Sequence, residues 1–240
     1  MADPVHDRMD SDSGALRAVL LDSLGTLVAL EPPGPRLRVE LGRRGIDVSE
    51  EEARAAFGME IHFYLEHHLE GSSAAALERL RDDCAGVLAG SLGIEPHRHA
   101  TVREAMLAAL RFAPYPDAAP ALRALRAAGL RLVVASNWDC SLAGALAAAG
   151  LRTLVDGVVT SAEVGSAKPD PALFRAALEV AGCAADTAVV VGDSPENDLA
   201  GARAAGIDAI LLARNAPARP VHTPAARSLD EARSLILAGV

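Results

Sequence analysis

The chain has 240 residues, of which 50% are hydrophobic and only 3% aromatic, so it can bury a sizeable aliphatic core. A net charge of −9 argues against a nucleic-acid or anionic-membrane surface, and no apolar run reaches the ~18–20 residues of a membrane span. Cys84, Cys140 and Cys183 lie far apart without a C-x-x-C spacing, so neither a disulfide framework nor a zinc site is predicted. We therefore expect a cytoplasmic globular protein without nucleic-acid or membrane partners.

Short apolar runs mark the expected strands. The first 14 residues are polar and acidic and have no apolar h-region, so we expect a disordered lead-in at residues 1–15 rather than a signal peptide. Five continuous apolar runs follow, as in strands that are buried on both faces, and helical patterns separate them from Arg131 onward. This alternation predicts a doubly wound parallel sheet in an α/β fold. The expected strands are Ala18–Leu21, Leu132–Ala135, Val158–Val159, Ala188–Val191 and Ala209–Leu212.

A block of about eighty residues after the first strand has a different pattern. It contains no strand-like run, and two capping-box patterns, Ser49–Glu52 and Thr101–Glu104, fall within it. The Pro-rich stretches Pro32–Pro35 and Pro114–Pro116 are the expected connectors at its ends. We predict a helical cap at residues 31–113, inserted into a Rossmann-like core at 16–30 and 114–240. The helical pieces expected in the cap are Glu50–Glu70, Ser73–Leu92 and Thr101–Phe112.

Capping residues and glycines delimit the helices expected in the second half of the chain. A Pro-rich loop without periodicity is expected at Pro217–Pro224. The expected helices start at Asp117, Asp139, Asp170-Pro171 and Ser194-Pro195 and end at Gly129, Gly150, Gly182 and Gly206, and a last one opens with the capping box Ser228–Glu231.

Polar side chains follow several of the expected strands. Parallel sheets bind ligands where the strands end, and Asp22, Ser136 and Asp193 each stand at such an end. Asp198 follows five residues after Asp193, and its carboxylate and that of Asp193 are hard oxygen ligands suited to Mg²⁺. Lys168, the only lysine beside 22 arginines, comes after the third strand and can balance charge there.

These parts suit the chemistry of phosphoryl groups. Ser136 and the backbone amides at the start of the following helix can hold an anion. Asp22 can be a nucleophile or a metal ligand. Together with Lys168 and a metal ion, the set fits in-line transfer of a phosphoryl group to a carboxylate.

The chain resembles the haloacid dehalogenase-like hydrolase superfamily, and within it the subfamily with a helical cap after the first strand. The similar motifs are D-S-L-G-T-L at Asp22, V-A-S-N-W-D at Ser136, A-K-P-D-P at Lys168 and V-G-D-S-P-E-N-D at Asp193. The resemblance runs from about Arg17 to the C-terminus. It implies that Asp22 is the nucleophile, that Ser136 binds the transferring group with Asn137 beside it, and that Lys168 steadies Asp22 and the substrate.

The resemblance also implies a Mg²⁺ site and a role for the cap. The ligands would be Asp22, the backbone carbonyl of Leu24, Asp193 and, through water, Asp198. The cap would select the substrate.

One position departs from the phosphatases of this superfamily. They carry D-x-D at the first motif, and their second Asp is the general acid/base, but Leu24 stands there. General acid–base help is typically worth ~10²–10⁴-fold, and leucine cannot supply it. Candidate replacements on one expected cap helix are Glu60, His62, Glu66, His67 and His68, of which His62 and Glu66 have the i,i+4 spacing of one helix face.

Three functions are compatible with this site. We favour Mg²⁺-dependent hydrolysis of a small phosphorylated metabolite through an aspartyl-phosphate on Asp22. A 2-haloacid dehalogenase, the first alternative, needs neither the second Asp nor a metal, but those enzymes usually have an aromatic residue at the position of Leu24 and do not keep the acidic pair Asp193 and Asp198. A catalytically weakened binding or regulatory module is the second. The expected partner is a small organophosphate, and the chain is expected to be a monomer or a homodimer.

Overall fold

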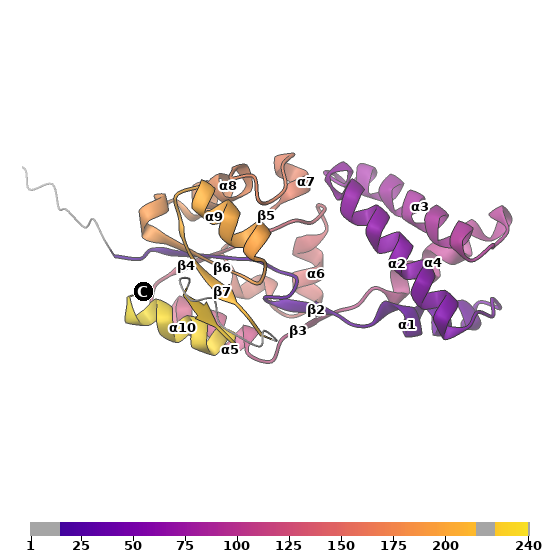
Figure 1. The fold of residues 1–240 in the computed structure, drawn as a ribbon, viewed down its shortest axis with the longest axis horizontal. Coiled ribbons are helices and arrows are strands. Elements are labelled where there is room, and N and C mark those ends of the chain that lie inside the picture. The colour runs from indigo at the N-terminus through magenta and orange to yellow at the C-terminus, as the bar shows by residue number, and fades with distance from the viewer. Residues whose placement is uncertain (1–14, 215–223, 240) are drawn as a thin grey trace, which may run out of the picture.

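The computed structural model of the protein describes residues 15–214 and 224–239. The predicted lead-in lies outside the described residues except for its last residue, and the predicted Pro-rich loop lies outside them except for Pro224. Figure 1 shows two lobes side by side: a sheet flanked by helices, and a bundle of helices. Within the described ranges, no helix combines the length and hydropathy that crossing a bilayer requires.

Six strands build the sheet of the larger lobe: β1 (Ala18–Leu21), β4 (Arg131–Ser136), β5 (Gly157–Thr160), β6 (Ala188–Gly192), β7 (Asp208–Leu212) and β8 (Ala225–Ala226). They run parallel in the order β5-β4-β1-β6-β7-β8. All five strands expected from the apolar runs are confirmed, and β8 adds a short edge strand that no such run announces. β1 is central, with Leu20 in register with Val133 and Val190.

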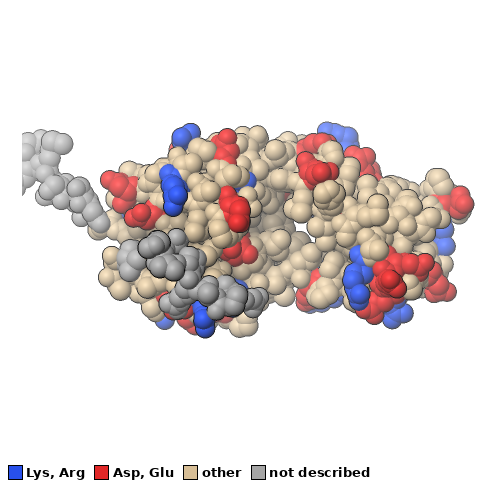
Figure 2. Space-filling view, in the orientation of Figure 1, with Lys and Arg blue, Asp and Glu red and all other residues tan. Residues whose placement is uncertain are grey.

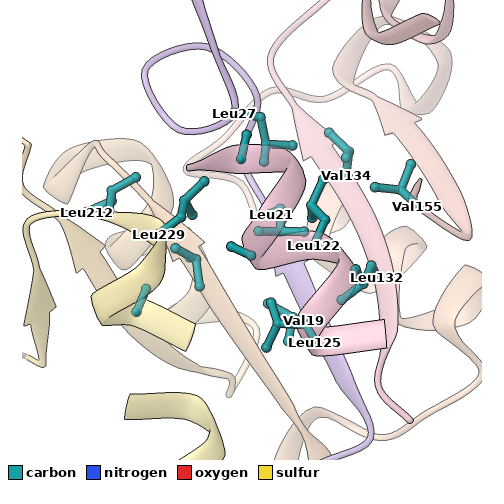
Figure 3. Close-up of a cluster of buried hydrophobic side chains, with 14 of the residues drawn as sticks. Val19, Leu21, Leu27, Leu122, Leu125, Leu132, Val134, Val155, Leu212 and Leu229 are labelled. Atoms are coloured by element: carbon teal, nitrogen blue, oxygen red, sulfur yellow. The ribbon is translucent and has the colours of Figure 1, made fainter. Parts of the chain in front are cut away.

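Helices cover both faces of the sheet, as a doubly wound fold requires (Figure 1). Because side chains alternate along a strand, Val19 and Leu21 pack on one face and Ala18 and Leu20 on the other. Figure 3 shows Leu21 beside Leu122 and Val19 beside Leu125, both of α5. The helices are α5 (Ala118–Ala127), α6 (Leu142–Ala148) and α10 (Leu229–Ala238) on the first face, and α8 (Ala172–Ala181) and α9 (Ala200–Ala204) on the second, with short α7 (Ser161–Val164) after β5.

The two aspartates expected to open helices have other side-chain partners, although α5 does begin directly after Asp117, as predicted. Asp117 makes no capping bond and instead binds the Arg214 guanidinium, at 2.9 and 3.0 Å, and the Leu229 amide, at 2.8 Å. The helix expected from Asp139 starts at Leu142, because the Asp139 carboxylate accepts hydrogen bonds from the Ser141 amide and the Tyr64 hydroxyl.

Several other expected helix ends are confirmed. Asp170 accepts a hydrogen bond from the Ala172 amide at the start of α8, which ends at Gly182 with φ 67°. Ser194 caps a single π-helical turn, η5 (Pro195–Leu199), which continues into α9. Ser228 caps α10 through the Glu231 amide, whereas the Glu231 carboxylate turns to the Arg227 amide instead of closing a full capping box.

The smaller lobe consists of four helices, which we call the cap helices: α1 (Pro33–Arg43), α2 (Glu50–His67), α3 (Ala74–Ser91) and α4 (His99–Ala109). They enclose a buried cluster of their own that includes Leu37, Phe57 and Met106. The Ser49–Glu52 capping box is confirmed. The Thr101–Glu104 box is wrong, because α4 begins two residues earlier at His99 and places Thr101 inside the helix.

The two connections between the lobes differ from the expectation of plain Pro-rich linkers. Pro33 opens α1, because proline is tolerated in the first turn of a helix. Gly34 lets α1 approach α2 closely, since a Cβ there would lie 2.9 Å from the Arg54 Cα. The connecting strands β2 (Val28–Leu30) and β3 (Phe112–Pro114) pair antiparallel, with Leu30 opposite Phe112. The segment that leads into the cap helices is thus hydrogen-bonded to the segment that leads out of them.

Candidate active site

Three carboxylates gather at the carboxyl edge of the sheet. Asp22 follows β1, Asp193 follows the neighbouring strand β6, and Asp198 lies in η5. Each offers an oxygen within 4.8 Å of the other two. The sequence motifs predicted this meeting, because parallel strands bring their carboxyl ends to one edge.

Two glycines make room for these carboxylates. A Cβ at Gly25, whose φ is +88°, would lie 2.0 Å from Asp193 Oδ2. A Cβ at Gly192 would lie 2.3 Å from the Asp198 carboxyl group. No side chain larger than hydrogen fits at either position without moving a carboxylate, so these glycines are part of how the acidic group is packed.

Lys168 joins two of the three carboxylates. Its Nζ donates to Asp22 Oδ1 and to Asp198 Oδ1, each at 2.6 Å, and to the Ala135 carbonyl at 3.0 Å. The residue is only 5% exposed. Burial alone would lower the pKa of Lys168, but the charges of Asp22 and Asp198 outweigh it, so the pKa is raised and the ammonium stays charged. The only lysine of the chain therefore lies between two of the clustered carboxylates.

Ser136, the last residue of β4, and Asn137 after it have different hydrogen-bond partners. Ser136 Oγ donates to Asp22 Oδ1 at 3.1 Å. Asn137 donates from Nδ2 to the Lys168 carbonyl at 3.1 Å and accepts from the Lys168 amide at 2.7 Å, so its side chain positions the lysine loop. The expected helix N-terminus beside Ser136 is not there, because α6 starts only at Leu142. The Trp138 amide in between donates to Ser161 Oγ.

The acidic group carries negative charge that Lys168 only partly offsets. Burial and the charge of Asp22 raise the pKa of Asp198 to about 6. Partial shielding from water and the charge of Asp22 raise the pKa of Asp193 to about 6 as well, although Asp193 as a residue is exposed. Crowded carboxylates whose ionised forms are disfavoured are the arrangement that a bound divalent cation stabilises, and their oxygens are the ligands that Mg²⁺ prefers.

A cavity of about 520 Å³ lies between the cap helices and the sheet lobe. Leu24, which is 43% exposed, and Asn137 line it on the side of the sheet lobe. Leu24 lies two residues after Asp22, and Asn137 directly follows Ser136. Figure 2 shows the surface hollowed between the two lobes. Most of the lining is aliphatic or aromatic, and its ionisable members are Glu60, Tyr64, Arg81, Cys84 and Asp139.

Two of the expected cap contributors do not face this cavity. His62 and Glu66 are 77% and 59% exposed in their side chains and contact each other at 3.4 Å. The face of α2 that lines the cavity instead carries Glu60 and Tyr64. The i,i+4 spacing correctly paired His62 with Glu66, but these residues lie on the solvent face of the helix. The face that lines the cavity could have been identified only from the buried positions of Ala56 and Phe57.

Hydrogen bonds join the end of α2 and the following 3₁₀ turn, η1 (His68–Glu70), to the sheet lobe. The sequence did not predict these contacts. His68 Nε2 lies 3.0 Å from Ser161 Oγ, and the Tyr64 hydroxyl donates to Asp139 Oδ2 at 2.8 Å. The Cys140 amide donates to the Gly71 carbonyl at 2.9 Å. His67 instead pairs with Glu70 at the surface. Of these residues, Tyr64 and Asp139 also line the cavity.

The parallel sheet, the carboxylates at its carboxyl edge and the buried lysine define a Rossmann-like α/β protein with a charged site at the strand ends. Residues 16–206 match the family model of haloacid dehalogenase-like hydrolases, and the chain belongs to this family of enzymes. The resemblance to the superfamily that was drawn from the four motifs is therefore confirmed.

Two relatives and one structure with the same fold are similar to this chain. Phosphoserine phosphatase of Thermus thermophilus is 32% identical over 247 aligned positions, which cover 93% of this chain and 99% of that protein. A HAD phosphatase structure from Thermococcus onnurineus is similar with a TM-score of 0.62 and 26% identity, over 93% of this chain and 99% of that one. A 2-haloacid dehalogenase from Pseudomonas syringae pv. Tomato, at a TM-score of 0.67, 23% identity and coverage of 93% and 98%, shares the fold.

Proposed function

We propose that this chain is a Mg²⁺-dependent phosphohydrolase that cleaves a small phosphate monoester through an aspartyl-phosphate on Asp22. The observation that carries the proposal is the way Asp22 is held. Both side-chain hydrogen bonds that the described residues give it, from Ser136 and from Lys168, end on Oδ1. Oδ2 is therefore the oxygen that can attack phosphorus.

The donor set of the site fits a magnesium ion. Asp22, Asp193 and the Leu24 backbone carbonyl would hold it. Asp198 would act through water, because its Oδ1 already accepts from Lys168 and its Oδ2 from the Ser194 amide. When bound, Mg²⁺ would neutralise charge on the carboxylates and on the transferring phosphoryl group.

Asp22, Lys168 and Ser136 would carry out the steps that do not depend on the metal ion. In the first step Asp22 Oδ2 bonds to phosphorus, and the bond from phosphorus to the leaving oxygen breaks. Lys168 holds Asp22 in place through its hydrogen bond to Oδ1 and, with Ser136, balances charge on the phosphoryl oxygens. In the second step water attacks phosphorus, which releases inorganic phosphate and restores the Asp22 carboxylate.

Leu24 limits which esters react well. Its side chain cannot protonate the leaving oxygen, which takes its proton from water or from the substrate's surroundings. We therefore expect esters of acidic alcohols to react much faster than alkyl esters. The names of the relatives, phosphatases among them, support the phosphate-ester function over the alternatives.

A second candidate function, carbon–halide hydrolysis, is favoured by one observation: an apolar residue, Leu24, stands beside an apolar cavity. The three clustered carboxylates count against it, because that reaction has no use for a cation.

The deciding experiment measures phosphate release from p-nitrophenyl phosphate and halide release from 2-chloropropionate, each with Mg²⁺ or with EDTA. Metal-dependent phosphate release that is abolished by Asp22→Asn supports the proposal. Halide release in EDTA, without phosphate release, overturns it.

A further inference from the structure

Glu60 is buried in the wall of the cavity between the lobes without a cation beside it. The residue is 4% exposed and lies on α2, with the thiol of Cys84 on α3 beside it. Within the described residues Glu60 forms no ion pair. Burial raises its pKa to about 7. A buried carboxyl group with only a weak sulfur partner is costly, so a ligand that supplies a better partner would gain from it.

The other ionisable groups of the cavity are already engaged. Arg81 Nη1 contacts Glu78 at 2.8 Å, and its side chain is 32% exposed. Asp139 accepts from Tyr64 and from the Ser141 amide. Burial and the neighbouring Asp139 raise the pKa of Tyr64, and burial and Glu60 raise that of Cys84, so both stay neutral. Glu60 is thus the ionisable residue of the lining that can pair with a cationic group of a ligand.

Most of the rest of the lining is apolar, with Ile61, Leu65 and Trp138 among its residues. It includes Leu24, two residues after Asp22, so the cavity borders the first motif of the acidic site. A volume of about 520 Å³ exceeds what a two- or three-carbon alcohol fills. Sugars and nucleotides would leave many hydroxyl and phosphate groups unpaired against such a wall.

We propose that this cavity receives the leaving group of the substrate, and that this group is an apolar chain or ring carrying a protonated amine that binds Glu60. The substrate class is then the phosphate monoester of an apolar, amine-bearing alcohol, and within this class acidic alcohols such as phenols should react fastest, because Leu24 supplies no proton. The inference rests on the proposed function for the reaction itself, but the amine preference is a property of binding and can be measured without turnover.

The test compares esters of equal length: hexyl phosphate, 6-hydroxyhexyl phosphate and 6-aminohexyl phosphate, with glucose 6-phosphate as the polar reference. We expect kcat/KM to be at least about tenfold higher for the amine than for the other two hexyl esters, and lowest for the sugar. Glu60→Gln should remove the amine preference, chiefly through KM. Glu51→Gln, at an exposed position of the same helix, should leave it unchanged.

Calorimetry with hexylphosphonate and 6-aminohexylphosphonate on the wild-type protein and on Glu60→Gln separates the two proposals. A tighter Kd for the amine that depends on Glu60 supports the inference even if no ester is hydrolysed, in which case the proposed function fails alone. Equal Kd values overturn the inference, as does a preference for the sugar ester. An equal fall in kcat for all esters in Glu60→Gln also overturns it, because Glu60 would then be moving a proton instead of binding an amine.

Discussion

The protein buries carboxyl groups in two places and treats them in opposite ways. At the sheet edge, Asp22 and Asp198 share the ammonium of Lys168, and hydrogen bonds fix both. In the cavity between the lobes, Glu60 has a thiol for a partner and, among the described residues, no cation. A buried carboxylate that is paired within the chain is held in a fixed position, as a reacting group must be. A buried carboxyl group that is left unpaired can instead bind a cationic group of a ligand. The contrast separates the part of the molecule that would carry out the reaction from the part that would select the substrate.

Asp22→Asn tests the paired side most severely. The amide is a poor nucleophile, so on the proposed function the turnover of p-nitrophenyl phosphate should fall at least about 10³-fold. Thermal unfolding should stay cooperative, because the amide can still accept from Ser136 and Lys168. Residual activity within tenfold of the wild type would show that Asp22 is not the nucleophile.

Lys168→Met removes the shared cation and should cost about 3–5 kcal/mol of stability at pH 7.5, since it leaves buried carboxylates uncompensated. The carboxyl groups that keep pKa values near 6 beside Lys168 would shift higher without it and take up protons as the pH falls. Urea unfolding at pH 5.0 should therefore show a smaller loss than at pH 7.5. An equal loss at both pH values would mean that Lys168 acts through packing.

Leu24→Asp adds the acid/base that phosphatases with a D-x-D motif carry. On the proposed function, kcat for alkyl phosphates should rise by about 10²-fold, and much less for p-nitrophenyl phosphate, whose leaving group needs no proton. Leu24→Asn is the matched control of similar size. If it accelerates alkyl esters equally, proton transfer is not the cause.

Glu60→Gln tests, through the free energy of unfolding, whether Glu60 is buried without a charged partner. The folded-state pKa of about 7 lies above the ordinary 4.5, so the native state binds the proton more tightly, and Glu60 weakens the fold as the pH rises from about 4.5 to 7. Relative to the wild type, Glu60→Gln should gain roughly 2–3 kcal/mol at pH 8 and little at pH 4.5. Denaturation curves at the two pH values check this, and a difference that does not change with pH would contradict a raised folded-state pKa of Glu60.

His62→Ala and Glu66→Gln should change almost nothing, because both side chains are exposed on the far face of α2. Exposed pairs of this kind contribute about 0–1 kcal/mol. A large loss of activity in either variant would mean that α2 turns this face to the substrate.

The two regions also differed in how far the sequence could predict them. Strands such as Ala188–Val191 are continuous apolar runs, and the residues that follow them must meet at one edge, so the acidic site was predictable. The cap helices carry no comparable signal. α2 has charged residues around much of its circumference, so its spacing paired His62 with Glu66 but could not identify the buried face with Glu60.

Short or proline-containing elements were missed for local reasons. β2 and β3 have three residues each and are defined by pairing with one another, which no pattern within either segment encodes. The start of α1 resembles a linker, because proline and glycine serve equally in turns and in a first helical turn. The contact of His68 with Ser161 joins residues 93 positions apart and follows only from the folded arrangement.

The central claim is that Asp22 forms a covalent bond to phosphorus. Acid quenching of the wild-type protein during turnover of p-nitrophenyl phosphate with Mg²⁺, followed by borohydride reduction and peptide mass spectrometry, tests it directly. Reduction of an aspartyl-phosphate converts the side chain to the alcohol, so we predict the mass of homoserine at position 22 and at no other aspartate. An unmodified Asp22 in protein that is releasing phosphate would contradict the account.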